Sequence, residues 1–449
     1  MTKSIYHRHK REAFESFFEF EDGNGTPDWP LEIFLEISNI CDLKCAMCPT
    51  FSSLNPHRFA NLQASDRGLM DIEQDTLPLE SLLRRASVVH AHGYGEPTIH
   101  PQFKEFISYL SEFEVLIDFF TNGMHLTQEV CDLLVAKSIY RVTVSFSGST
   151  TEEYNNVYLG GDFDKVLAGI KRLADTKKAH DSLYPRIDVN SIGFKHHVEQ
   201  FPEFVRLMGE HGVNAIHLKP LSTYELIPEL HHHKALPDQH ARTTLAKAEA
   251  VAKNYDLALH TKPFESAPIE AEAADSSTQT IDIVDLKKHS RGVVQMRTEK
   301  PKTVADYQPS RDEQFEHEGT PCLEPFKTLY AAFDGNVFPC CFKGCQSGLG
   351  KLKNDDAETI WNYEEFGKLR EGIVQGRYPA QLCGACVRKS TYPKSHGIDR
   401  IVHQYSRWFL KKFGVPFHAH IQQRARKSLS NLEIVRGACS KNAVTSQVV

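Results

Sequence analysis

LEISNICDLKCAMCP, residues 35–49, joins an apolar run to three cysteines, Cys41, Cys45 and Cys48, at the spacing CxxxCxxC. The apolar run Leu31–Ile37 has the length and composition of a buried strand. Three thiolates at this spacing suit a soft metal site. A structural zinc ion would need a fourth ligand, and we find none nearby in the sequence. The stretch therefore predicts a metal-binding loop that leaves the end of a strand.

The length and composition of the chain set its broad class. Its 449 residues suggest two or three domains, and 41% hydrophobic with 24% charged residues are typical of a globular protein. A net charge of −6 provides no basic footprint for nucleic acid. No run approaches the roughly 20 apolar residues of a membrane span, and the basic start MTKSIYHRHK lacks the apolar core of a secretory signal. We therefore expect a cytoplasmic protein with no transmembrane segment and no nucleic-acid partner.

The eleven cysteines are unevenly placed along the chain. Three fall between residues 41 and 48 and six between 322 and 386, which leaves Cys131 and Cys439 elsewhere. Disulfides are rare in a reducing compartment, so clustered cysteines there indicate metal binding or catalysis.

Strand-like and helix-like segments alternate between residues 31 and 222. The apolar runs are Leu31–Ile37, Ser87–His92, Val115–Phe120, Arg141–Phe146, Arg186–Ile192 and Ala215–Leu218. Segments with helical periodicity between them include 101–113, 127–137, 163–177 and 198–211. This alternation predicts an α/β fold with a parallel sheet, and six units are too few for a closed eight-fold barrel. We expect a partial (β/α)6 barrel whose chemistry lies at the C-terminal ends of its strands.

The rest of the chain divides by composition. Residues 1–30 are polar and predict an N-terminal extension, while 31–222 hold the partial barrel. Residues 223–315 predict a partly flexible connecting segment with one helix near 238–255. Residues 316–393 hold the second cysteine group, and 394–449 form a basic, aromatic tail with a helical pattern.

The second cysteine group surrounds a predicted β-hairpin. Residues 329–340 read as two short strands joined by an Asp334-Gly335 turn. Cys322, Cys340 and the CxxC pair Cys383 and Cys386 supply four soft ligands. A zinc ribbon is built from similar parts, so zinc stays open as an alternative to an iron–sulfur cluster. Cys341 and Cys345 are spare and could replace one of the four.

The CxxxCxxC loop and three later segments resemble the radical S-adenosylmethionine (SAM) superfamily. His92-Gly93-Tyr94-Gly95-Glu96-Pro97 is similar to that family's GGEP segment, and Thr121-Asn122-Gly123 to its TNG turn. The resemblance covers about residues 31–222; Met47 departs from it, because many members carry an aromatic residue there. It implies that Cys41, Cys45 and Cys48 hold a [4Fe–4S] cluster whose open iron binds SAM. The residues that it assigns to SAM are Gly93, Tyr94, Gly95, Glu96, Asn122, Ser145 and Asn190.

The second cysteine group resembles the SPASM/twitch extension that binds auxiliary [4Fe–4S] clusters in this superfamily. No cysteine follows Cys386 before Cys439, so the pattern matches the shorter twitch form, with one auxiliary cluster. The resemblance implies a radical SAM oxidoreductase in which the auxiliary cluster accepts an electron, and a low-potential donor such as flavodoxin or ferredoxin. Members act on peptides, as in anaerobic sulfatase maturation, or on small alcohols. We expect a small molecule, a sugar or aminocyclitol-like alcohol, because residues 1–30 are too few for a peptide-recognition domain.

Two alternatives remain beside this expectation. The chain could be a peptide-modifying or protein-modifying maturase, or a non-catalytic iron–sulfur or zinc protein. For the catalytic case, strand alternation places His217 and Lys219 on one face of the sixth strand, where a general base could deprotonate a substrate radical. A pair that simply faces solvent is the competing interpretation.

Overall fold

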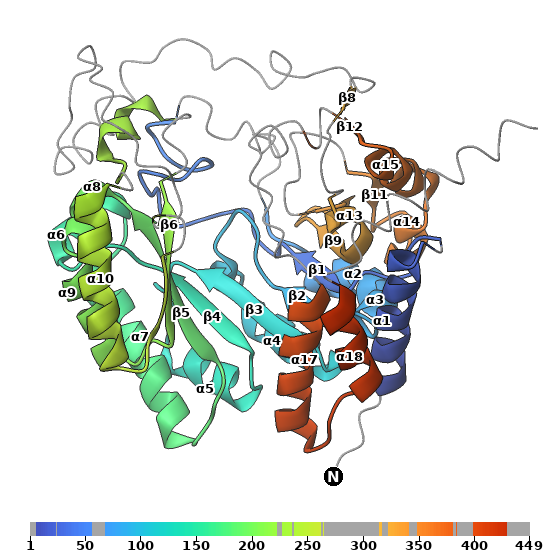
Figure 1. Cartoon of the computed structure of the whole chain (residues 1–449), viewed down its shortest axis with the longest axis horizontal. Coiled ribbons are helices and arrows are strands. Elements are labelled where there is room, and N and C mark those ends of the chain that lie inside the picture. The colour runs from blue at the N-terminus through green and yellow to red at the C-terminus, as the bar shows by residue number, and fades with distance from the viewer. Residues whose placement is uncertain are drawn as a thin grey trace, which may run out of the picture.

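A computed structural model describes residues 6–23, 25–55, 68–221, 227–235, 238–261, 264, 314–316, 322–340, 348–379, 383 and 398–428. Its core is one ten-stranded sheet in the order β11-β10-β9-β1-β2-β3-β4-β5-β6-β7 (Figure 1). The six central barrel strands are β1 (Glu32–Leu35), β2 (Val88–His90), β3 (Leu116–Thr121), β4 (Arg141–Ser145), β5 (Arg186–Gly193) and β6 (Ala215–Pro220). All six pair in parallel with their neighbours, so the predicted partial (β/α)6 barrel is confirmed. A seventh parallel strand, β7 (Ala258–His260), extends it beyond β6.

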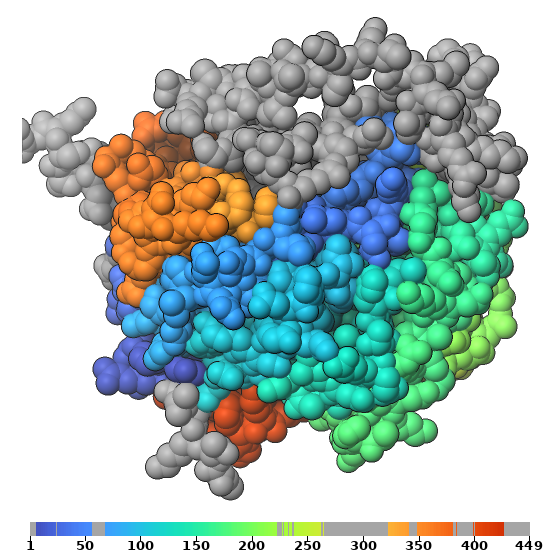
Figure 2. Space-filling model, turned by 180° about the vertical axis from the view of Figure 1, so that it is seen from behind, coloured from blue at the N-terminus to red at the C-terminus, as the bar shows by residue number. Residues whose placement is uncertain are grey.

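Helices cover the outer face of the barrel sheet. They include α2 (Ile72–Thr76), α3 (Glu80–Leu83), α4 (Phe103–Leu110), α5 (Gln128–Ala136), α6 (Thr151–Val157), α7 (Phe163–Ala179), α8 (Lys195–Glu199), α9 (Phe201–Glu210) and α10 (Gln239–Lys253). Helix α7 shows why the sequence folds this way: Asp162 caps its first turn through Lys165 N (3.0 Å), and Val166, Ile170 and Leu173 form its buried stripe. Figure 2 shows the segment of residues 72–179, coloured light blue to green, across this face.

The predicted hairpin is present and belongs to the same sheet as the barrel. Strands β9 (Thr328–Ala331) and β10 (Asn336–Phe338) are antiparallel, and Gly335 in the turn between them has φ +82°. Strand β9 pairs in parallel with β1, so the second cysteine region continues the barrel sheet directly. Other elements here are α13 (Glu324–Lys327), β11 (Gly350–Lys351), α14 (Ala357–Trp361), α15 (Glu364–Val374) and the antiparallel pair β8 (Gln314–Glu316) and β12 (Arg377–Pro379).

A buried ion triplet joins the hairpin region to the barrel. Lys327 Nζ lies 2.6 Å from Glu32 Oε2 and 2.9 Å from Glu324 Oε1, and all three side chains are almost fully buried. Although burial opposes it, the two carboxylates raise the pKa of Lys327 above its usual value. The lysine is therefore charged, and its two partners compensate its desolvation.

Both ends of the described chain pack together. Helix α1 (His7–Glu21) lies in the segment that we expected to be a polar extension, and its Phe14, Phe17 and Phe20 are buried. They share a core with Tyr405 and Trp408 of α17 (Ile398–Phe413), and α18 (Ala419–Ser428) also contacts α1 (Figure 1). The remaining short 3-10 helices are η1 (Leu77–Leu79), η2 (Pro97–Ile99), η3 (Ser111–Phe113) and η4 (Pro228–His233). No helix in the described ranges is long and apolar enough to cross a membrane.

Candidate active site

The three-cysteine loop leaves the C-terminal end of β1 and is fixed by backbone hydrogen bonds. Lys44 N donates to Leu159 O (2.9 Å) and Ala46 N to Val157 O (2.8 Å), which ties the loop to the end of α6. Ser52 Oγ donates to Ala46 O (2.7 Å). The loop therefore has a defined path at the strand end where the sequence predicted the chemistry.

The thiols of this loop occupy surroundings that disfavour negative charge. Burial raises the pKa of Cys41 to about 12, and burial together with the neighbouring thiolates raises that of Cys45. Burial also raises the pKa of Cys48. Three such sulfurs need a cationic partner to ionise together, so the donor set fits an iron–sulfur cluster. Within the described ranges no three His, Cys, Asp or Glu side chains form a ready-made metal site, so the ligand roles stay predictions.

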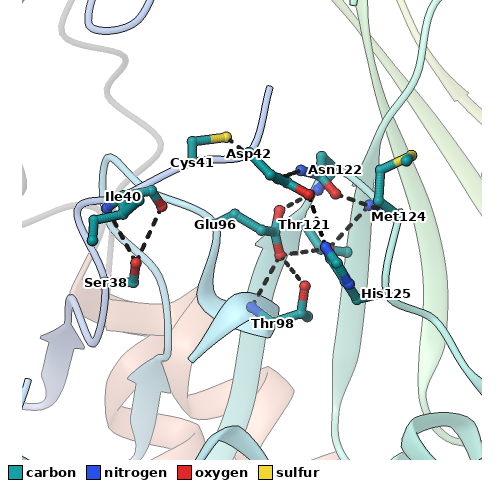
Figure 3. Close-up of polar contacts among 11 residues, drawn as sticks. Ser38, Ile40, Cys41, Asp42, Glu96, Thr98, Thr121, Asn122, Met124 and His125 are labelled. Carbon is teal, nitrogen blue, oxygen red and sulfur yellow. Dashed lines mark hydrogen bonds and ion pairs between the residues drawn. The ribbon is translucent and has the colours of Figure 1, made fainter. Parts of the chain in front are cut away.

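Glu96 joins the ends of β2 and β3. Its Oε1 accepts hydrogen bonds from Thr98 N (3.0 Å), Thr98 Oγ1 and Thr121 Oγ1 (2.8 Å), and its Oε2 accepts one from Asn122 N (2.6 Å) (Figure 3). Burial raises the pKa of Glu96 in spite of these donors. The carboxylate thus organises the turn around Asn122, and a contact between Glu96 and SAM stays a prediction.

The glycines of the Gly93-Tyr94-Gly95 segment are required by close packing against the protein itself. A Cβ at Gly93 would lie 2.3 Å from Glu36 Cγ, and one at Gly95 would lie 2.4 Å from Ser38 O. Tyr94 N donates to Glu36 Oε1 (2.9 Å). The two glycines therefore allow a close approach to the segment that leads into the cysteine loop, and their contact with SAM stays a prediction.

Asp42 is a site residue that the sequence analysis missed. Its Oδ1 accepts a hydrogen bond from Asn122 Nδ2 (2.6 Å), and its Oδ2 lies 2.8 Å from His125 Nε2 (Figure 3). The Asn122 amide, which the resemblance assigned to SAM, thereby holds the cysteine loop. The available signal was the position of Asp42 directly after Cys41.

Ser145 is the last residue of β4, and its register partner Asn190 lies within β5, three residues before the strand ends. Asn190 is in turn the register partner of His217 on β6. The structure therefore brings the last two predicted SAM contacts next to one candidate base, although their roles remain predictions.

His217 belongs to a three-residue cluster on the inner face of the sheet. Its Nε2 lies 3.2 Å from Asp188 Oδ2, and its ring stacks on His260 with centroids 4.5 Å apart at 11°. Although burial opposes it, the hydrogen bond with His217 and the charge of Arg186 lower the pKa of Asp188. Lys219 lies two residues further on the same strand and is exposed. An anionic Asp188 orients the imidazole, as a general base requires.

A second charged cluster on this face was also missed. His90 Nδ1 lies 2.7 Å from Asp118 Oδ1, and Arg141 donates to the other oxygen of that carboxylate. Although burial opposes it, Asp118 raises the pKa of His90 to about 9, whereas burial lowers that of His92 to about 3. The His90 ring stacks on Phe34 at 4.2 Å, so this cluster joins β1 to β3.

The auxiliary ligands are placed only in part. Cys322 precedes α13, and its backbone N donates to Tyr378 Oη (3.2 Å). Cys340 follows β10, and Cys383 is also placed. Cys386 and the spare pair Cys341 and Cys345 lie outside the described residues.

Comparisons with known proteins agree with the two predicted cysteine regions. The Radical SAM superfamily model matches residues 35–183, and an iron–sulfur cluster-binding domain model, SPASM, matches residues 322–387. Mycofactocin maturase MftC of Mycobacterium tuberculosis is 26% identical over 187 residues, 41% of this chain and 43% of the maturase. The match thus spans less than half the length of that relative.

Two further comparisons cover more of the chain. The AdoMet-dependent heme synthase of Methanosarcina barkeri is 23% identical over 359 residues, 80% of this chain and 87% of the synthase. The crystal structure of Streptococcus suis SuiB bound to precursor peptide SuiA aligns with a TM-score of 0.49 at 14% identity, covering 80% of this chain and 72% of SuiB. The two matched domains imply a SAM-binding [4Fe–4S] cluster and auxiliary iron–sulfur binding. The chain therefore contains a radical SAM domain at residues 35–183 and a SPASM domain at residues 322–387.

Proposed function

We propose that this chain is a radical SAM maturase that abstracts a hydrogen atom from a peptide or protein substrate. The observation that carries the proposal is the 26% identity with a maturase over 187 residues. This favours the alternative that we kept at the sequence level over our main expectation, the oxidation of a small alcohol. When bound, the cluster and SAM supply the 5′-deoxyadenosyl radical that makes such an abstraction possible.

The open sheet supports a substrate that is larger than a simple alcohol. Its order ends at β11 on one side and at β7 on the other, so the sheet does not close into a barrel in the described ranges. Phe120 at the end of β3 is 37% exposed although it is apolar. Its ring contacts that of His92, with 4.7 Å between the centroids, and it precedes the Thr121-Asn122 turn, so it is a candidate contact for an apolar group of the substrate.

The residues of the chain take defined roles in this proposal. Cys41, Cys45 and Cys48 hold the SAM-binding cluster, and the predicted SAM contacts surround the same strand ends. His217, oriented by Asp188, removes a proton from the substrate radical; Lys219 at the exposed end of β6 binds an anionic group. Auxiliary ligands are Cys322, Cys340, Cys383 and Cys386, and one cluster there would accept the remaining electron.

A small-molecule substrate is the second candidate. The match to AdoMet-dependent heme synthase favours it, because that match covers 80% of the chain and 87% of the synthase. The two candidates share the radical chemistry and differ in what the inner face of the sheet binds.

The test uses the full chain, reconstituted with iron and sulfide without oxygen and reduced with dithionite. We expect 5′-deoxyadenosine to form from SAM, and about eight irons per chain if there are two clusters. The absence of 5′-deoxyadenosine in fully loaded protein would favour a non-catalytic iron–sulfur protein. About four irons with one zinc would refute the auxiliary cluster.

A second experiment identifies the substrate class by the transfer of deuterium from a labelled substrate to 5′-deoxyadenosine. Deuterated peptides encoded next to the gene are compared with deuterated 2-deoxy-scyllo-inosamine. The proposal expects deuterium in 5′-deoxyadenosine and a modified mass only with a peptide. Transfer from the aminocyclitol alone would reverse the order of the two candidates. A Cys45→Ala variant is the control for both, because it removes one predicted cluster ligand.

A further inference from the structure

Asp42 connects the cysteine loop to the turn after β3. Its carboxylate receives Asn122 Nδ2 at 2.6 Å on one oxygen and lies 2.8 Å from His125 Nε2 on the other (Figure 3). The Cys41 thiol also donates toward Asp42 Oδ1, with 3.9 Å between the sulfur and the oxygen. One side chain thus touches a predicted cluster ligand and a different strand end.

The turn that Asp42 holds is rigid. Asn122 N donates to the buried Glu96, Asn122 Oδ1 accepts from Met124 N (2.9 Å), and Gly123 N donates to Thr121 Oγ1 (3.0 Å). Gly123 has φ +79°, and a Cβ there would lie 2.6 Å from Val166 Cγ1, within the core of the barrel. The turn cannot shift without disturbing β3 and α7, so it is a fixed anchor for the loop.

The Asp42 carboxylate lies beside a sulfur atom of the cysteine loop, with 3.9 Å between its Oδ1 and the Cys41 sulfur. A negative charge this close to a ligand sulfur opposes the addition of an electron to a cluster bound there. Water screens this effect only in part, since the Asp42 side chain is 32% exposed.

We propose that Asp42 is a positioning residue that fixes the cysteine loop on the Asn122 turn. It also keeps a negative charge beside the three cysteines, and this charge lowers the reduction potential of the bound cluster. The inference rests on the proposed ligation by Cys41, Cys45 and Cys48. It does not depend on whether the substrate is a peptide. Cleavage of SAM needs a strongly reducing cluster, so a fixed carboxylate at this place favours the reaction.

The test compares reduction potentials of reconstituted full-length protein by redox titration with electron paramagnetic resonance. Asp42→Asn keeps an oxygen for Asn122 and removes the charge, so we expect the midpoint potential of the SAM-binding cluster to become more positive. His125→Phe leaves Asp42 charged without its imidazole partner, so we expect the opposite shift. The exposed His125 side chain, 38% accessible, makes this variant compatible with folding.

Asp175→Asn is the matched control, because Asp175 pairs with Lys171 on the exposed side of α7. It removes the same charge and should leave the potential unchanged. Opposite shifts in the two test variants, which a purely structural role would not produce, support the proposal. An unchanged potential in Asp42→Asn, or shifts of the same sign in both variants, would overturn it. If one of the two variants binds less iron, the sign of the change in midpoint potential of the other variant decides whether the proposal holds.

Discussion

The inner face of the sheet has two regions that hold charge in different ways. On the side of β9 and β1–β3, Lys327, Glu32, His90 and Asp118 are buried and pair with one another. On the side of β5–β7, Asp188 is buried, while 26% of the His217 side chain is exposed. A buried pair of fixed charges specifies how elements join, whereas a buried carboxylate behind an accessible imidazole can move a proton. The first region therefore fixes how the hairpin region packs on the barrel, and we call its ion-paired residues Lys327, Glu32, His90 and Asp118 the joint. The second region is better suited to catalysis.

The largest expected effect lies in the β5–β7 region. His217→Gln should slow substrate turnover by about 10²–10⁴-fold, because the general base is lost. Formation of 5′-deoxyadenosine without substrate should not change, since His217 acts after the hydrogen abstraction. Turnover assays with the substrate identified by deuterium transfer provide the measurement. His240→Gln, at an exposed position on α10, is the control, and equal rates in the two variants would contradict the role.

In the joint, Lys327→Met should lower the free energy of unfolding by about 3–5 kcal/mol, because it leaves Glu32 and Glu324 buried without their cation. Denaturant unfolding of the full chain measures the change. Lys368→Met is the matched control, since Lys368 pairs with Glu364 at 2.6 Å with both side chains at least 70% exposed. It should cause no measurable change. Similar losses of unfolding free energy in both variants would show that the buried triplet stabilises the chain no more than an exposed ion pair does.

The joint should also make stability depend on pH. The pKa of His90 is about 9 in the folded chain against 6.5 ordinarily, so its contribution is complete below pH 6.5 and is lost as the pH rises through about 9. The unfolding free energy of the wild type should fall by up to about 3 kcal/mol between pH 6 and 9.5, relative to His90→Gln. Parallel pH profiles for the two proteins would exclude this linkage.

The sequence predicted the barrel and the cysteine regions because their signals are local. Alternation of apolar runs with helical periods located all six central strands, and CxxxCxxC with Gly-Tyr-Gly-Glu located the strand ends. The joint could not be predicted, because Glu32 and Lys327 are 295 residues apart and meet only when β9 pairs with β1. Helix α1 was missed because the basic residues before its phenylalanines and the glutamates between them hid an amphipathic stripe. Asp42 was missed because its partners lie on another strand end.

The smallest expected effect distinguishes the role of Asp188, which orients the imidazole, from the role of His217, the proposed base. Asp188→Asn keeps the shape of the side chain and one acceptor but removes the charge, so we expect kcat to fall about tenfold with KM unchanged. The pKa of Asp188 is lowered in the folded chain, so the wild-type carboxylate stays ionised from pH 5 to 9 and the substitution removes its charge throughout that range. Rates measured at three values of pH give the test, with Asp164→Asn, an exposed change in the first turn of α7, as the control. A deficit as large as that of His217→Gln would contradict this small effect, because it would mean that His217 cannot act as a base without the Asp188 charge that fixes its tautomer.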